Sequence, residues 1–225
     1  MSKTIEPRFI SIAFLFSLCA HSLFASTTRA ETSSLPKQLK SMQAKYAGVK
    51  TLTTQFEQKR TSVALGTTTE TSGRIYIKRP SSFRWETHQP DPSIMISNGK
   101  KLWYYTPAPD KKTPGRVQIH SATDVQSNLA VDLLSGQSDL QKSFAIEEDS
   151  SKEPPIYRLK PKIPAGDIDH IELYVEKKTN LIYKLILFTT IGNRTELVLD
   201  NVAFGPKLPD SMFNFTPPPN TEEIR

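Results

Sequence analysis

Apolar side chains follow two different periods along the chain. Between residues 35 and 49 they repeat every three to four positions, as Leu35, Leu39, Met42, Tyr46 and Val49. This spacing predicts an amphipathic helix of about 14 residues that ends near Gly48. The same spacing returns over 124–134, where a second, short helix is expected to end before Gly136.

Between and after these helices the period is two, which is typical of strands with one buried face. The alternation predicts eleven strands, at 51–60, 72–78, 83–87, 93–97, 101–106, 116–120, 144–147, 157–159, 171–176, 182–188 and 194–204. Turn residues separate them, and Asn98-Gly99 is typical of a tight hairpin. Gly192-Asn193 marks another turn, in the last hairpin.

The order of helix, strands, helix, strands with short connections favours one mainly β domain with antiparallel pairing. We expect a single, strongly curved sheet with an apolar inner face and a polar outer face, and with both helices against the inner face. A helix in that position is either a core plug or a lid, and periodicity does not distinguish the two.

The first 30 residues have the layout of a secretory signal. Lys3 and Arg8 precede an apolar run at 9–18, and small residues follow up to Ala30. The sequence therefore predicts a signal peptide at 1–30 and one domain at 31–225, in an exported protein for which we expect the periplasm. The chain's one cysteine, Cys19, follows Leu18, which is not the small residue of a lipoprotein signal, so we expect it to be removed.

Composition narrows the function classes. Hydrophobic residues make up 37% of the chain and the mean hydropathy is −0.41, which leaves no membrane-spanning segment after the signal. The net charge of +6 is dispersed, without the basic and aromatic clusters of a nucleic-acid interface. Nucleophile-elbow and phosphate-loop motifs are absent from the sequence, and the run 167–170 is a weak metal candidate. We expect no catalytic residues, no metal and no cofactor.

The segment 73–107 carries a specific pattern of glycine, proline and aromatic residues. It comprises Gly73, Arg79-Pro80, Phe83, Trp85, Asn98-Gly99, Leu102-Trp103-Tyr104-Tyr105 and Pro107. This pattern resembles the LolA family, the periplasmic carriers of outer-membrane lipoproteins. Phe56-x-Gln58 upstream and the run 213–218, Phe-Asn-Phe-Thr-Pro-Pro, are similar to the same family, whereas 110–165 matches loosely.

The resemblance implies an unclosed, half antiparallel β-barrel of about eleven strands, with helices forming a lid over a hydrophobic cavity. It further implies a soluble monomer that takes acylated lipoproteins from an inner-membrane ABC transporter and delivers them to the outer-membrane receptor LolB or its equivalent. Two alternatives on the same fold stay open at this point. One is a membrane-anchored receptor of the LolB kind, and the other is a different lipid- or glycolipid-binding relative.

The resemblance also assigns roles to residues. Arg79 matches the family arginine that holds the lid closed through hydrogen bonds. The expected lining of an acyl-chain cavity combines strand residues with residues of the second helix: Phe56, Ile75, Ile77, Phe83, Trp85, Ile94, Ile96, Leu102, Tyr104, Leu129, Val131, Leu133 and Leu134. The strand assignments depend on parity, because one bulge turns every later side chain to the other face. The basic loop 107–114 departs from the family pattern.

Overall fold

The computed structural model describes residues 35–122 and 129–224. The expected signal peptide, with Cys19, and the first residues of the second expected helix lie outside this range. The helices are α1 (Lys37–Ala47), α2 (Leu129–Leu134), α3 (Leu140–Ser143) and the 3-10 helix η1 (Asp210–Phe213). The strands are β1 (Thr51–Ser62), β2 (Thr67–Lys78), β3 (Ser82–Gln89), β4 (Ser93–Asn98), β5 (Lys101–Thr106), β6 (Gly115–Ser121), β7 (Phe144–Asp149), β8 (Ile156–Pro161), β9 (Ile168–Val175), β10 (Ile182–Thr189), β11 (Arg194–Phe204) and β12 (Thr221–Glu223).

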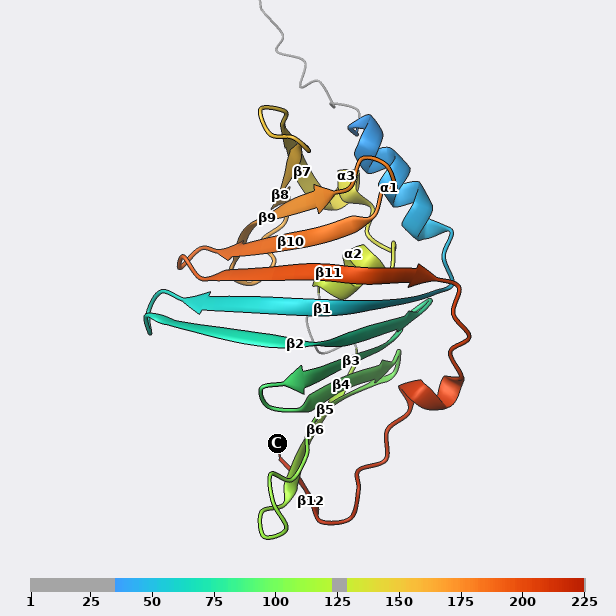
Figure 1. Ribbon diagram of the computed structural model, residues 1–225, viewed down its shortest axis with the longest axis vertical. Helices are drawn as coiled ribbons and strands as arrows, with labels where there is room; N and C mark the ends of the chain where they lie inside the picture. Colours follow the sequence, from blue (N-terminus) through green and yellow to red (C-terminus); the bar gives the residue numbers. More distant parts are fainter. Residues whose placement is uncertain (1–34, 123–128, 225) are drawn as a thin grey trace, which may run out of the picture. The chain divides into compact units, whose positions relative to one another are not determined.

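All strands belong to one 12-stranded sheet in the order β12-β6-β5-β4-β3-β2-β1-β11-β10-β9-β8-β7 (Figure 1). Strands β1–β6 form one sequential meander and β7–β11 form another, and the pairing of β1 with β11 joins the two. Because β7 and β12 stand at opposite ends of this order, the sheet is unclosed. The fold expected from the sequence, a mainly β half-barrel with helices on one face, is confirmed.

The tight hairpins lie where the sequence places them. Gly99 in the β4–β5 turn and Gly192 in the β10–β11 turn have φ values of 84° and 85°, which a residue with a β-carbon rarely adopts. One strand was not expected. β12 is three residues long and pairs in parallel with β6, with the Ile224 N–H donating to the Val117 carbonyl at 2.9 Å.

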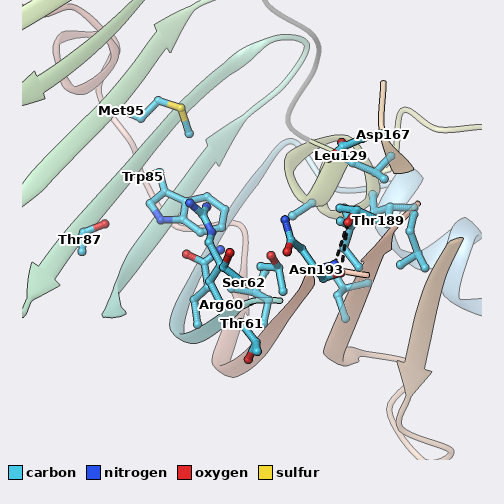
Figure 2. Close-up of a pocket in the computed structure, with 18 of the residues that line it drawn as sticks. Arg60, Thr61, Ser62, Trp85, Thr87, Met95, Leu129, Asp167, Thr189 and Asn193 are labelled. Atoms are coloured by element: carbon cyan, nitrogen blue, oxygen red, sulfur yellow. Dashed lines mark hydrogen bonds between the residues drawn. The ribbon is translucent and has the colours of Figure 1, made fainter. Parts of the chain in front are cut away.

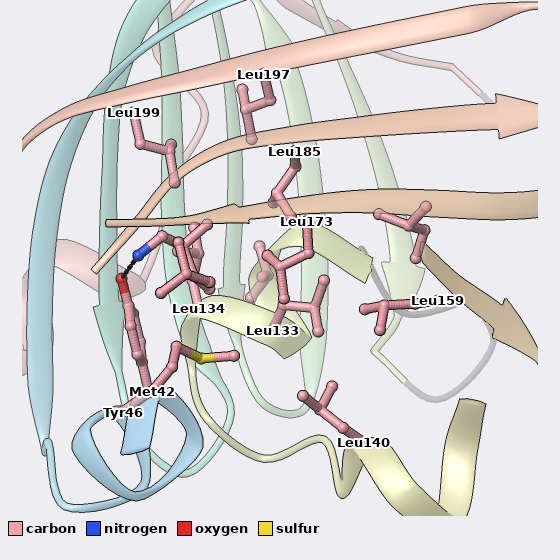
Figure 3. Close-up of a cluster of buried hydrophobic side chains, with 14 of the residues drawn as sticks. Met42, Tyr46, Leu133, Leu134, Leu140, Leu159, Leu173, Leu185, Leu197 and Leu199 are labelled. Atoms are coloured by element: carbon pink, nitrogen blue, oxygen red, sulfur yellow. Dashed lines mark hydrogen bonds between the residues drawn. The ribbon is translucent and has the colours of Figure 1, made fainter. Parts of the chain in front are cut away.

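The main core lies between the inner face of the sheet and the three α-helices (Figure 3). Tyr46 of α1 is 1% exposed; its hydroxyl accepts a hydrogen bond from the Ile182 N–H at 3.0 Å, and its ring meets Phe204 edge-on at 5.3 Å. Gly136, just after α2, has a φ of 65°, and a β-carbon there would come within 2.6 Å of the Tyr46 backbone. A glycine therefore lets the end of α2 meet the end of α1.

The outer face is less uniformly polar than the sequence suggests. Ile96, Trp103, Tyr105 and Val117 form a second buried cluster, and Phe215 packs on it with its ring 5.0 Å from that of Tyr105. The chain after β11 thus covers the outer face of this part of the sheet, which explains why alternation alone assigned the wrong face to some residues.

Candidate functional site

A cavity of about 530 Å³ lies on the inner face of the sheet, next to α2 (Figure 2). Trp85, Met95 and Tyr104 of β3, β4 and β5 line one side. Apolar side chains of three other strands and of α2 complete the lining: Ile171, Leu185, Leu187, Leu197, Leu129, Ala130 and Leu133. Its volume falls within the range of about 300–1,000 Å³ that is typical of small-ligand pockets.

Strand register brings the apolar lining together. Met95 pairs with Trp85 on one side and with Tyr104 on the other, so three neighbouring strands present a large side chain to the same face. Across the cavity, Leu187 pairs with Ile171 and with Thr195. Directly paired residues of neighbouring strands lie on the same face, and this rule builds both walls.

Polar side chains surround the end of the cavity near the hairpin turns. They come from β1, from the β10–β11 hairpin and from the end of the β8–β9 loop: Gln58, Arg60, Thr61, Ser62, Asp167, Thr189 and Asn193. The Asn193 N–H donates to Thr189 Oγ1 at 3.0 Å, and the Thr190 N–H donates to the Asp167 carbonyl at 2.8 Å. The cavity therefore has an apolar interior and a polar edge, and we call this edge the mouth.

Four of the residues expected in the cavity line it: Trp85, Tyr104, Leu129 and Leu133. Tyr104 is 44% exposed, so its wall reaches solvent. Six others belong to the packed core beside the cavity rather than to its lining: Phe56, Ile75, Ile77, Phe83, Val131 and Leu134. Leu102 is 7% exposed and shares a face with Tyr104.

Two expected cavity residues are wrong. Ile94 pairs with Glu86 and Ile96 with Arg84, so both lie on the face opposite to Trp85 and Met95. They belong to the outer cluster under the C-terminal segment. An alternating strand with apolar residues on both faces has no sequence signal that says which face is inner, and the choice between Met95 and its two neighbours was made by the tertiary structure.

The sequence reasoning missed the second half of the cavity wall. Alternation within 171–176, 182–188 and 194–204 was visible, but the wall residues there were not assigned to a cavity: Ile171, Leu185, Leu187 and Leu197. Their position follows from the pairing of β1 with β11, which places two segments far apart in sequence on one inner face. Alternation in β9, β10 and β11, combined with the pairing of β1 with β11, would have indicated them.

Arg79 lies at the opposite end of the strands from the mouth, just after β2. Its Nη1 donates a hydrogen bond to the carbonyl of Ala47 at the end of α1, and its backbone N–H donates to the Lys50 carbonyl at 2.9 Å. Cations near the C-terminal carbonyls of a helix stabilise it. The arginine therefore fixes the C-terminal end of α1, which packs on the inner face of the sheet.

The shifted pKa values follow from burial and hydrogen bonding within the fold. Burial raises the pKa of Tyr46 to about 12, and a hydrogen bond to His170 lowers the pKa of Asp169. The His170 ring stacks on Phe188 at 4.5 Å, on the outer face, so of the run 167–170 Asp167 lines the mouth of the cavity and His170 does not. In the ranges 35–122 and 129–224, no group of three or more His, Cys, Asp or Glu side chains is arranged to hold a metal ion.

No helix in the part of the chain that the structure describes is both long and apolar enough to cross a bilayer.

Comparison with known proteins identifies relatives. The family model described as "Outer membrane lipoprotein carrier protein LolA" matches residues 47–216, which is more than half of the chain. An outer-membrane lipoprotein carrier protein of Pseudomonas aeruginosa is 28% identical over 209 residues, covering 92% of this chain and 96% of that protein.

A solved structure shows the same fold at low identity, and a second one is similar at a lower TM-score. An uncharacterized conserved protein from Thermus thermophilus superposes with a TM-score of 0.50 and 13% identity, over 83% of this chain and 98% of that one. A LolA superfamily protein from Nitrosomonas europaea has a TM-score of 0.43 and 10% identity, over 78% and 97%.

Proposed function

Because this chain belongs to the LolA family of outer membrane lipoprotein carrier proteins, we propose that it binds the acyl chains of lipoproteins released from the inner membrane and carries them to the outer membrane. The observation that carries this proposal is the apolar cavity on the inner face, bounded by α2 and two walls of the sheet. The protein acts as a chaperone of its cargo, and its function requires no catalytic step.

The chemistry of the cargo explains why a carrier needs such a cavity. Burial of lipid is worth about 0.8 kcal/mol per CH₂, so a chain of sixteen carbons gains about 12 kcal/mol by leaving water. A lipoprotein released without a carrier would therefore return to a membrane or aggregate. The inner face offers aliphatic and aromatic contacts from Trp85, Met95 and Leu187, with Leu129 and Leu133 of α2 opposite.

We infer a location and partners from the same function. A carrier between two membranes works in the periplasm, and the pattern of residues 1–30 fits export. The cargo would be received from an ABC transporter of the inner membrane and passed to LolB or an equivalent receptor.

Arg79 is the residue to which we assign a gating role. Its hydrogen bond to Ala47 fastens the end of α1, and Gly136 places the end of α2 against the same turn. Breaking the arginine contact would loosen α1 and, through this packing, α2 beside the cavity. The arginine contact thus stabilises the position of α1 and α2 over the inner face. Cargo that displaces these helices must compete with that stability.

The experiment that tests the function is capture of cargo from a periplasmic extract by the affinity-tagged protein, followed by mass spectrometry. The carrier function predicts recovery of triacylated or diacylated proteins of many sequences. Recovery of free lipids or glycolipids alone would favour the other lipid-binding relative. Mass spectrometry of the mature N-terminus is the companion measurement, because an acylated Cys19 would instead establish a membrane-anchored receptor.

A further inference from the structure

Four of the five strongly exposed large apolar side chains in residues 35–122 and 129–224 lie in three loops. Val63 and Leu65 are 61% and 76% exposed in the β1–β2 turn, Ile191 is 64% exposed in the β10–β11 turn, and Ile163 is 80% exposed in the β8–β9 loop. Single exposed apolar residues are ordinary, whereas a group of them marks a contact surface. We call these four residues the apolar tip.

Hydrogen bonds hold the three loops together. The Val63 N–H donates to Asn193 Oδ1 at 3.0 Å, which joins the β1–β2 turn to the β10–β11 turn. The Thr190 N–H donates to the Asp167 carbonyl at 2.8 Å, which joins the β10–β11 turn to the β8–β9 loop. Figure 1 shows the first two turns side by side at one end of their strands.

The apolar tip borders the mouth of the cavity. Asn193 and Asp167, which make the joining bonds, both line the cavity, as do Thr61 and Ser62 just before Val63. Figure 2 shows Asn193, Asp167 and Ser62 around this edge. A surface that contacts the tip therefore also lies next to the mouth of the cavity.

We propose that the apolar tip docks on an anionic bilayer, so that Val63, Leu65, Ile163 and Ile191 enter the headgroup region and the mouth of the cavity faces the membrane. This inference rests on the proposed carrier function and adds the surface through which the protein approaches a membrane. Cargo exchanged with the transporter or the receptor would then stay close to the bilayer surface while it enters or leaves the cavity.

Two features favour a bilayer over a protein partner. The tip consists of aliphatic side chains, whereas the energetic centres of protein interfaces are enriched in Trp, Tyr and Arg and poor in Leu and Val. Its basic residues also outnumber its acidic ones, which suits an anionic lipid surface. Lys59 and Arg194 of these hairpins are paired with Glu70 and Glu196.

Three further cations lie beside the tip: Arg60 in β1, Lys160 in β8 and Lys162 in the β8–β9 loop. Lys160 acts on the carboxylate of Asp169, and the Lys162 ammonium donates to the Gln141 carbonyl at 2.6 Å. None of them takes part in a salt bridge among the residues that the structure describes. Each basic residue near an anionic surface adds to membrane attraction. Together with Lys59 and Arg194 there are five cations near the tip, against the four carboxylates of Glu70, Asp167, Asp169 and Glu196. The tip therefore combines apolar side chains with a small excess of positive charge, as surface-binding segments do.

The first experiment is co-sedimentation of the full, cargo-free protein with vesicles of phosphatidylethanolamine and phosphatidylglycerol. We expect binding that weakens with salt and a loss of at least about tenfold in affinity for the variant Val63→Ser, Leu65→Ser, Ile191→Ser, since burial of even one such side chain is worth tenfold or more. The changed side chains are exposed, and an unchanged melting temperature would show that the variant is folded.

The second experiment reports orientation. Leu65→Trp, at the tip, should be quenched by brominated lipid, whereas Ala203→Trp should not be, because Ala203 is exposed on β11 at the far end from the tip. The wild-type protein, with Trp85 and Trp103, gives the background to subtract.

Three results would overturn the proposal: no vesicle binding by the wild-type protein, equal binding by the triple variant, or quenching of both tryptophan reporters alike. Binding to a purified transporter in detergent that is lost in the triple variant, without any vesicle binding, would identify a protein as the occupant. Uptake of a soluble acylated probe tests the carrier function separately. If the wild-type protein takes up the probe but does not bind vesicles, the docking proposal is rejected and the carrier function stands.

Discussion

Leu187→Glu is the sharpest test of the cavity as an acyl-chain site. Leu187 lines the cavity but does not belong to the packed core cluster, and it is only partly buried. The substitution therefore places a carboxylate against the proposed lipid while leaving the core intact. It differs in this respect from a change at Leu133, which serves both core and cavity.

The magnitude follows from desolvation. An acyl chain packed over an unpaired carboxylate would keep water from it, which costs several kcal/mol even after local relaxation. Each 1.4 kcal/mol is a factor of ten in affinity. We therefore expect Leu187→Glu to lower the affinity for a fluorescent acylated peptide by about 100-fold or more at neutral pH, with little loss of stability.

The assay is a fluorescence titration with that peptide, in which pH provides an internal check. A neutral carboxyl is far cheaper to bury, so affinity should recover as the pH falls to about 4, near the ordinary pKa of a glutamate. Leu187→Met keeps the site apolar, and Val198→Glu adds the same charge to the partly buried outer face of β11. Both controls should bind the peptide normally. Unchanged binding by Leu187→Glu, or equal losses in the Val198 control, would refute the cavity as the acyl-chain site.

Three further predictions concern the elements around the cavity. Arg79→Leu removes the hydrogen bond to Ala47; we expect it to accept cargo but to deliver it poorly to the receptor, and normal delivery in a reconstituted transfer assay would exclude the gate. Tyr46→Phe leaves the buried Ile182 N–H without its acceptor and should cost about 1–3 kcal/mol in chemical denaturation. Because the folded pKa of Tyr46 is raised to about 12, its share of stability is present below the unfolded pKa of about 10 and is lost as the pH rises towards 12, a loss that the variant should lack. Phe215→Ala removes the ring that covers Tyr105 and should cost about 2 kcal/mol, with faster hydrogen exchange at Ile224, whose N–H bonds to Val117.

The periodicity of the chain was sufficient for the fold class and for most of the elements. Hairpin turns with glycine and strict alternation in segments such as 51–60 left few possible strand registers, because a shift of one residue would expose the apolar face. Short elements were missed for a physical reason. α3 and β12 have too few residues to show a period. The Asp139 side chain caps α3 by accepting a hydrogen bond from the Lys142 N–H, and β12 is held by its pairing with β6.

The cavity could be predicted only in part. The family motif gave Trp85 and Tyr104; the strand of Trp85 alternates cleanly, whereas residues 102–105 are all large, so parity alone would not have chosen Tyr104. The sequence could not decide the face of β4, where Ile94 and Ile96 alternate with Met95 and both sets are apolar. The outer set is buried because a distant segment, ending in Phe215, covers it.

The sequence by itself determined the strands, the tight turns and the family pattern, all of which depend on local backbone preference and on residues close together in the chain. The tertiary structure alone decided which apolar residues pack and which line a cavity. That division depends on the pairing of β1 with β11 and on the placement of α2, which bring together side chains more than a hundred positions apart, such as Trp85 and Leu197. A void forms where these surfaces meet without filling the space between them, and no local pattern encodes a volume left empty.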